Sequence, residues 1–440
     1  MFFSNSTCLA CGTPLGYAPQ AGLLLPLEPA PPQPAQQPSR QAAPQSGQQH
    51  AQQSGEQSGQ PSEQQPQATP QRWSEAGQEG RGPRYLRCAN LDSASACNWL
   101  IEEDDALASA FTDAQGLTLC RCCRLSRTLP DLSLPGNAER WKRIEEAKRR
   151  LVSSLIGLQL PVLPQRPDEA APGLAFDLLQ SLPDGPRVMT GHADGVVTLD
   201  VEEADDATRE QRRTQMHEPY RTLLGHLRHE VGHYYWLRLV EGSGWLEPFR
   251  ALFGDERADY AQALRRHYDE GARPDWPLAH VSAYASSHPW EDWAETWAHY
   301  LHIFDSLDTA RSFGLDGELV ELDFERYDAA ALADEGGGSS SGAGTGIEHD
   351  AASAEFIAML NGWMELAAVL NELSRSMGLP DFYPFVLSVP VVRKLQFVHR
   401  VVHVRPPAVK PPAAATQPAA QPSASAGGSG QRAGAAAAKS

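Results

Sequence analysis

Five residues near the middle of the chain, HEVGH at positions 229–233, combine two imidazoles and a carboxylate at a spacing suited to metal chemistry. Two histidines four residues apart lie on one face of a helix, about one turn from each other. His229 and His233 can therefore bind the same zinc ion, and Glu230 can take a proton from a zinc-activated water. The alternative is a core helix whose histidines are satisfied by ordinary hydrogen bonds.

A pair of carboxylates downstream, Glu291 and Glu295 in EDWAE, lies four residues apart among three tryptophans. Burying them beside indole rings is costly without a cation or hydrogen-bond donors, and a zinc ion with its histidines supplies both. Trp236 and Leu239 stand where a metzincin motif needs glycine and histidine, so the third ligand should come from a later helix, as in gluzincins. We assign Glu291 as that ligand and Glu295 as the partner of a ligand histidine. The reverse order, and His299 as a ligand, are the alternatives.

Two further features could serve the same site. Tyr284 precedes the carboxylate pair, where a tyrosine or histidine in several gluzincins donates a hydrogen bond to the oxyanion. An ordinary packed tyrosine is the alternative. Two strands are predicted at 188–190 and 196–201. In the turn between them, His192 and Asp194 could bind metal, but a turn that uses them for its own hydrogen bonds is favoured. In zinc peptidases a strand before the HExxH helix is the edge along which an extended substrate lies.

The seven cysteines are clustered as CxxC-type pairs, which in a chain without a secretion signal favours metal ligation over disulfides. Four thiols predict one closed, structural zinc site: Cys88, Cys97, Cys120 and Cys123. Cys122 is an extra thiol, and the alternative is a set of buried or redox-active cysteines. Cys8 and Cys11, followed by a glycine that allows a tight turn, form a zinc knuckle that supplies half of a tetrahedral site.

Hydrophobic periodicity predicts the helices that position these residues. The expected segments are 137–160, 220–240 with Pro219 in its first turn, 249–268, 289–305 with Pro289 in its first turn, and 352–377. The residues of the last segment expected to point inward are Phe356, Leu360, Trp363, Leu370 and Leu373. The basic run Lys148, Arg149 and Arg150 on the first segment is interpreted as a solvated flank.

Length, charge and composition limit the classes of function that the chain can have. The chain has 440 residues, a formal net charge of −18 and a sequence pI near 5.2, which argues against a general nucleic-acid or anionic-membrane binder. No stretch approaches the roughly 20 apolar residues of a membrane span. The N-terminus lacks a basic start followed by an apolar core, so no secretion signal is expected and a cytoplasmic protein is the default.

The chain resembles a bacterial family of zinc-binding metallopeptidases with an N-terminal zinc-ribbon region, gluzincin-like HExxH proteins. The matching stretches are CxxCGTPLGY, CANLDSASACNWL, CRLSRTLPDLSLPGNAERWKRIEEAKRRL, RVMTGHADGVVTL, EPYRTLLGHLRHEVGHYYW, FGDERADY and HPWEDWAETWAHYLH, and they cover most of residues 84–325. The resemblance implies a zincin fold and one catalytic-type zinc, but no known substrate. Family members usually carry a further CxxC pair before Cys8 and Cys11, and without it these two thiols lack evident local partners.

The expected fold class is α+β: a zinc-ribbon module followed by a mainly helical zincin-like metallopeptidase domain with a small antiparallel sheet. The expected organisation is the first half of the zinc-ribbon region (1–25), a disordered Gln/Pro/Ser-rich linker (26–83), the four-cysteine zinc-ribbon module (84–130), the zincin-like domain (137–332), a flexible Gly/Ser insertion (333–350), the C-terminal helical part of the domain (351–404) and a disordered Pro/Ala tail (405–440).

The sequence therefore predicts a zinc-dependent metalloendopeptidase with one catalytic-type and one structural zinc ion, acting on a peptide or protein substrate. Nucleic acid and membrane are not expected partners, and the oligomeric state is left open. The main alternative is a non-catalytic, zinc-stabilised protein- or nucleic-acid-binding module on a zincin scaffold. Hydrolysis of a non-peptide amide is a third interpretation. Glu230 favours the enzyme, because a site that merely holds zinc does not need it.

Overall fold

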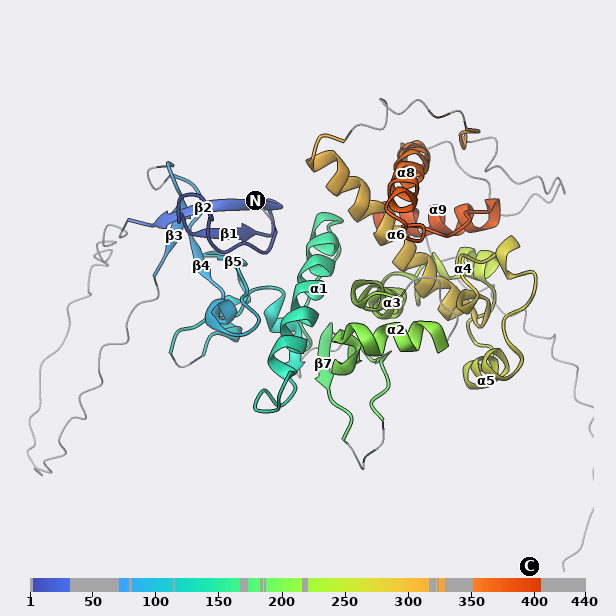
Figure 1. Cartoon of the computed structure of the whole chain (residues 1–440), viewed down its shortest axis with the longest axis horizontal. Coiled ribbons are helices and arrows are strands. Elements are labelled where there is room, and N and C mark those ends of the chain that lie inside the picture. Colours follow the sequence, from blue (N-terminus) through green and yellow to red (C-terminus); the bar gives the residue numbers. More distant parts are fainter. Residues whose placement is uncertain are drawn as a thin grey trace, which may run out of the picture.

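The computed structural model describes residues 3–31, 71–78, 81–113, 115–166, 173–182, 185, 187–215, 221–315, 322, 324–328 and 351–404 (Figure 1). The Gly/Ser insertion, the Pro/Ala tail and the middle of the expected linker lie outside these residues. The ends of that linker are not disordered, because each contributes a strand to the N-terminal sheet. Of the helices that the structure describes, none is long and apolar enough to cross a membrane.

The N-terminal region is one antiparallel sheet with strand order β1-β2-β3-β4-β5. Its strands are β1 (Leu15–Ala18), β2 (Leu23–Pro29), β3 (Trp73–Glu75), β4 (Tyr85–Arg87) and β5 (Leu100–Glu102). β2 pairs with β3 across the expected linker, with Leu27 opposite Glu75. The segments before and after the linker therefore build a single sheet. A short 3₁₀ turn, η1 (Ala89–Asp92), connects β4 and β5, and two more follow the sheet, namely η2 (Ala108–Phe111) and η3 (Cys123–Leu125).

Helix α1 (Asn137–Gly157) lies between this sheet and the helical region (Figure 1). Its expected apolar face is buried, but so are Lys148 and Arg149, with 0% and 2% exposure. The interpretation of the basic run as a solvated flank is therefore wrong for these two residues. Lys148 pairs with Glu145 at 2.7 Å, and Arg149 donates to the side chain and the carbonyl of Ser95. Both cations are buried because α1 packs against the ribbon, which periodicity within one helix cannot show.

A second sheet has strand order β6-β7-β9-β8 and lies beside the central helices. Its strands are β6 (Ser126–Thr128), β7 (Ala175–Leu179), β8 (Gly191–Ala193) and β9 (Val196–Asp200). The pairs β6–β7 and β7–β9 are parallel, and β8 pairs antiparallel with β9, so the small sheet expected to be antiparallel is mixed. The first strand of the expected hairpin therefore lies at 191–193 rather than 188–190. Asp194 and Gly195, with φ of 48° and 81°, form the tight turn that places it there.

The remaining elements that the structure describes are helical. Its elements are η4 (Val201–Ala204), α2 (Asp206–Gln215), α3 (Leu223–Tyr235), the π-helical η5 (Trp236–Val240), α4 (Leu246–Phe253), α5 (Tyr260–Glu270), η6 (Trp276–Leu278), η7 (Tyr284–Ser286), α6 (Pro289–Ser312), α8 (Ala351–Ser376) and α9 (Val389–His403). Together with the two sheets they confirm the α+β class. Helices α2 and α9 were not expected from the sequence.

Several helix boundaries differ from expectation for local reasons. Helix α3 begins at Leu223 because Thr222 is extended and its hydroxyl accepts from the N–H of Gly225; Pro219 and Tyr220 lie outside the described residues. The segment expected as one helix at 249–268 is divided into α4 and α5 after Gly254, whose φ is 102°. Pro289 begins α6 as expected. In α8 the expected inward position of Leu373 is wrong, because the last buried residue is Ala367 and Leu373 is 58% exposed.

Helices α3 and α6 pack closely against each other at the centre of the helical region. Gly232 faces α6 so closely that a Cβ atom there would lie 3.1 Å from the Cα of Ala294 and 3.3 Å from Trp297. The indole N–H of Trp293 donates to the carbonyl of Gly232 at 2.8 Å. The glycine of HEVGH therefore permits a close approach of the two helices. This approach brings the motif histidines within reach of the carboxylates on α6.

Candidate metal centres

The side chains of HEVGH converge with α6 at a buried site. His229 Nε2 lies 3.0 Å from Glu291 Oε2, and His233 Nε2 lies 3.6 Å from the same oxygen. Ligand atoms of these three buried residues all lie within 4.8 Å of one another. A tetrahedral zinc ion with bonds of about 2.0–2.1 Å keeps its nitrogen and oxygen ligands roughly 3.3 Å apart. The arrangement therefore fits zinc, whereas 3.6 Å is too long for a hydrogen bond.

Glu295, one turn further along α6, contacts His229 from its other side. Its Oε1 accepts a hydrogen bond from His229 Nδ1 at 2.7 Å, and its Oε2 accepts one from the hydroxyl of Ser282 at 2.6 Å. A carboxylate bonded to Nδ1 leaves Nε2 as the nitrogen that faces the other candidate ligands. The two glutamates of EDWAE thus occupy different places, Glu291 within the ligand group and Glu295 behind it.

Glu230 is 7% exposed and follows His229 directly on α3. Burial, opposed by the charges of the two neighbouring histidines, raises the pKa of this carboxyl above its usual range. A buried carboxylate with a raised pKa is suited to accept a proton near neutral pH.

Tyr260, at the start of α5, is a site residue that we did not predict from the sequence. Its hydroxyl donates to Glu291 Oε1 at 2.5 Å, whereas the two histidines lie near Oε2. Partial burial and the neighbouring charge of Glu291 raise the pKa of the phenol, so it stays protonated as a donor. FGDERADY, the stretch that ends at Tyr260, is one of those that match the family, and this was the signal available in the sequence.

The other predicted neighbours lie around this group. The ring of Tyr284 lies 5.9 Å from that of His229, and burial raises the pKa of its phenol. His192 on β8 lies 6.2 Å from the ring of His233, and its Nε2 accepts from the N–H of Gly195, the local turn bond that the sequence favoured. Burial, followed by the charge of His233, lowers the pKa of His192 to about 4. It is therefore neutral at physiological pH.

His299, the weaker ligand candidate, lies outside the ligand group that the structure brings together. Its Nδ1 is 2.7 Å from the hydroxyl of Tyr383, and burial lowers its pKa to about 4. This histidine is thus engaged by a tyrosine that follows α8 rather than by the candidate metal ligands.

A second group brings together four buried thiols: Cys88, Cys97, Cys120 and Cys123, whose sulfurs lie within 4.8 Å of one another. The sulfurs of Cys97 and Cys120 are 3.7 Å apart. A tetrahedral site with zinc–sulfur bonds of about 2.3 Å places its sulfurs roughly 3.8 Å apart, so the group fits zinc. Burial raises the pKa of Cys97 and Cys120, and thiolates so buried require a cation.

The remaining three cysteines lie outside this group. Cys122 is fully buried beside it, and burial raises the pKa of its thiol. Cys8 and Cys11 form the expected tight turn, with Gly12 at φ 73° and its N–H bonded to the carbonyl of Cys8. Within the described residues these two thiols meet no third cysteine, and Cys11 is exposed. The structure thus brings together the predicted four-thiol set and leaves the knuckle as a pair.

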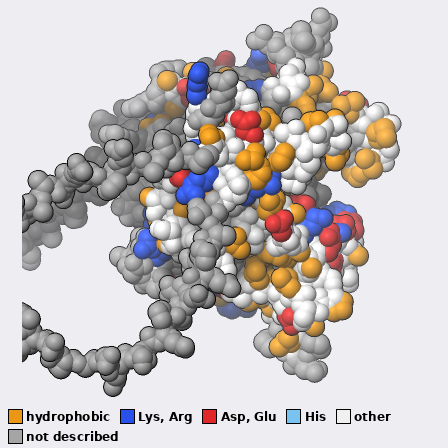
Figure 2. Space-filling view, turned by 90° about the vertical axis from the view of Figure 1, so that its left-hand side faces the viewer, with side chains coloured by type: hydrophobic (Ala, Val, Ile, Leu, Met, Phe, Trp, Pro, Cys, Tyr) orange, Lys and Arg blue, Asp and Glu red, His pale blue; other side chains and the backbone are white. Residues whose placement is uncertain are grey.

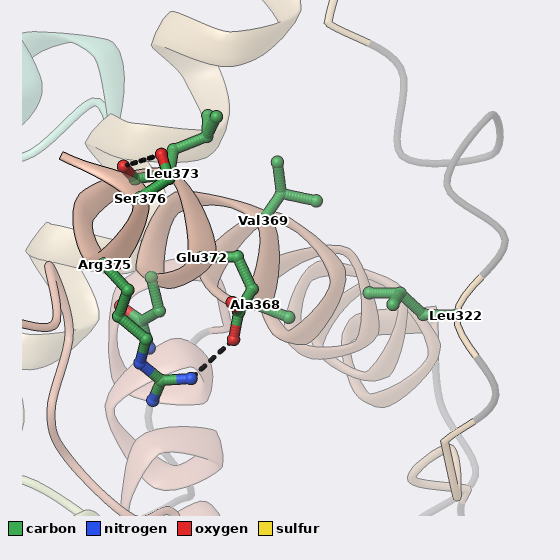
Figure 3. Close-up of a pocket in the computed structure, with 8 residues that line it drawn as sticks. Leu322, Ala368, Val369, Glu372, Leu373, Arg375 and Ser376 are labelled. Atoms are coloured by element: carbon green, nitrogen blue, oxygen red, sulfur yellow. Dashed lines mark hydrogen bonds and ion pairs between the residues drawn. The ribbon is translucent and has the colours of Figure 1, made fainter.

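One surface pocket lies away from both metal centres. It has a volume of about 750 Å³ and runs along the C-terminal half of α8, where Leu322 faces Ala368 and Val369 (Figure 3). On the ribbon side of the molecule, basic and acidic side chains are interspersed among apolar and neutral ones (Figure 2).

The sequence profile of a family described as "Putative zinc-binding metallo-peptidase" matches residues 137–401. The chain belongs to this family. A zinc-ribbon domain profile matches residues 47–134. These matches confirm the resemblance that the motifs indicated. Uncharacterized proteins of Mycobacterium bovis and Mycobacterium tuberculosis are 44% identical to the chain over 328 residues, which is 74% of this chain and 84% of theirs. No solved structure matches the chain.

Membership of this metallopeptidase family accords with both ligand groups. The family profile runs from the start of α1 into α9 and therefore includes both HEVGH and EDWAE. The ribbon profile covers all four thiols of the cysteine group. Zinc binding is thus supported both by the family and by the geometry of the two ligand groups.

Proposed function

We propose that the chain is a gluzincin-type zinc metalloendopeptidase that hydrolyses peptide bonds in cytoplasmic peptides or proteins. The convergence of His229, His233 and Glu291 with Glu230 between the histidines carries this proposal. Three protein ligands and a fourth position open to water are the arrangement of catalytic zinc sites, whereas the closed four-thiol group is suited to a structural ion.

Each residue of the site has its own role in the proposed reaction. When bound, zinc would polarise the scissile carbonyl and acidify the attacking water. Glu230 takes the proton of that water and passes it to the leaving amine. Glu295 keeps His229 in the tautomer whose Nε2 faces the ligand group. Tyr284, whose ring lies 5.9 Å from that of His229, is the proposed donor of a hydrogen bond to the oxyanion.

The edge strand β8 supports a peptide as the substrate. β8 is the last described strand on its side of the sheet, and its His192 ring lies 6.2 Å from that of His233. An extended peptide can pair with such an edge as an additional strand, which positions a backbone carbonyl through main-chain hydrogen bonds. A non-peptide amide would gain no such pairing.

The test is Glu230→Gln in the full chain, with zinc content measured by elemental mass spectrometry and hydrolysis measured on a library of quenched fluorescent peptides. We expect unchanged zinc content and a loss of turnover of about 10²- to 10⁴-fold, the usual contribution of a general base. Glu247→Gln is the matched control, because that side chain is 81% exposed on α4.

Undiminished hydrolysis by a zinc-loaded Glu230→Gln variant would sink the assignment of the base. A zinc-loaded wild type that cleaves no peptide of the library, nor its own 26–83 segment, would favour the non-catalytic binding module instead.

A further inference from the structure

The two oxygens of Glu291 have different surroundings. Oε2 lies 3.0 and 3.6 Å from the Nε2 atoms of His229 and His233, while Oε1 accepts the hydroxyl hydrogen of Tyr260 at 2.5 Å. The carboxylate is itself only 1% exposed, so water cannot replace the phenol freely. A carboxylate in these surroundings can bind a metal ion through Oε2 while Oε1 stays hydrogen-bonded to Tyr260.

The helix that carries Tyr260 is not part of the hydrophobic core. None of the residues of α5 is buried, and Tyr260 itself is 38% exposed. The helix lies between Gly254 and Gly271, both with positive φ, and its N-terminus is capped by Asp259. Since core packing does not fix α5, the contact of Tyr260 with Glu291 is not a by-product of burying this helix.

Aromatic contacts orient the phenol. The ring of Tyr260 lies 5.2 Å from that of His288 and 6.2 Å from that of Trp290, both edge-to-face. His288 caps α6 by accepting the N–H of Trp290, and its other ring nitrogen is 3.1 Å from the carbonyl of Ala258. The residue that caps the helix bearing Glu291 therefore also holds the chain just before Tyr260.

We propose that Tyr260 is a positioning residue that holds Glu291 as a one-oxygen zinc ligand and thereby keeps a coordination position open. This inference rests on the zinc centre of the function proposed above. Without the phenol, Oε1 is free to turn toward the metal, and a two-oxygen carboxylate occupies the position that a catalytic site leaves open. The hydroxyl of Tyr260 therefore matters for the metal's coordination, whereas its ring matters only for packing.

The test compares wild type with Tyr260→Phe as full chains, using zinc affinity from chelator competition and the visible absorption of the cobalt-substituted protein. The spectrum of His233→Ala is subtracted to remove absorption from the four-thiol site. We expect Tyr260→Phe to lose about 10- to 100-fold in zinc affinity, the usual effect of removing the partner of a ligating carboxylate. We also expect weaker visible absorption, because cobalt absorbs less intensely with five ligands than with four.

Tyr268→Phe is the matched control on the same helix, where the side chain is 59% exposed, and it should change neither quantity. A Tyr260→Phe protein with the spectrum and affinity of wild type would overturn this inference while leaving the zinc centre and the proposed reaction in place. A wild type that binds no more cobalt than His233→Ala would overturn the proposed function and this inference together.

Discussion

At the scale of single residues, Glu291 and Glu295 are chemically identical and one turn apart, yet they contact opposite ring nitrogens of His229. Glu291→Ala removes a candidate ligand, whereas Glu295→Ala removes only the bond that orients a ligand. We therefore expect Glu295→Ala to lose about 10- to 100-fold in zinc affinity, and Glu291→Ala to lose more. Chelator competition on the two purified variants measures both losses.

Ser282→Ala provides the control for this comparison. Ser282 donates to the second oxygen of Glu295 and acts on the candidate ligands only through that carboxylate, so its loss should be the smallest of the three. A larger loss for Glu295→Ala than for Glu291→Ala would reverse the assignment of the third ligand and restore the alternative order.

The convergence of the candidate ligand residues was predictable because their spacing within one helix limits where they can point. HEVGH and EDWAE each place their functional groups one helical turn apart, and four clustered cysteines imply a shared site. Tyr260 could not be found in this way. Its contact with Glu291 depends on where α5 lies over α6, and neither periodicity nor spacing specifies the position of a helix without buried residues.

At the scale of elements, the packing of α3 on α6 makes Gly232 sensitive to any added atom. A Cβ there would lie 3.1 Å from the backbone of α6, which cannot move aside as a side chain can. We expect Gly232→Ala to lower the free energy of unfolding by about 1–3 kcal/mol, the usual cost of overpacking, and to weaken zinc binding by separating the histidines from Glu291. Urea unfolding and chelator competition measure the two effects.

Gly362→Ala is the matched control, since Gly362 also lies within a helix but a Cβ there would meet only Leu307 at an ordinary 3.8 Å. That substitution should be neutral or stabilise by up to about 1 kcal/mol, because alanine favours the helix. If Gly232→Ala is as stable as Gly362→Ala, α3 and α6 are not held at contact distance.

Helix existence was easier to predict than helix limits. Periodicity located α1, α3, α6 and α8, but the division after Gly254 depends on one backbone dihedral, and the start of α3 depends on a hydroxyl cap. Leu373 continues the periodic apolar face of α8 beyond the part that is buried. Periodicity thus indicates which face of a helix could be buried, and tertiary packing decides how far along it burial extends.

At the scale of the whole molecule, the basic run on α1 has an electrostatic role that the helix alone does not show. Four thiolates around one zinc ion would carry excess negative charge. The buried Lys148 and Arg149 interact electrostatically with Cys123, a member of that group, and with the neighbouring Cys122. Although burial opposes it, Glu145 and these thiols raise the pKa of Lys148, so the amine stays charged.

The core is continuous from the thiol group through α1 to α3 and α6, so the ribbon and the metallopeptidase region are expected to unfold together.

Arg149→Met tests this electrostatic link between the two regions. Arg149 is 2% exposed and donates to the hydroxyl and the carbonyl of Ser95, within the loop between Cys88 and Cys97. Losing a buried cation beside thiolates should lower the free energy of unfolding by about 3–5 kcal/mol and speed the loss of zinc to a thiol-reactive probe.

Arg150→Met is the control. Its side chain is 42% exposed and its ion pair with Asp305 should contribute less than about 1 kcal/mol. Equal destabilisation by the two variants in urea unfolding would mean that α1 only packs against the ribbon and does not balance its charge.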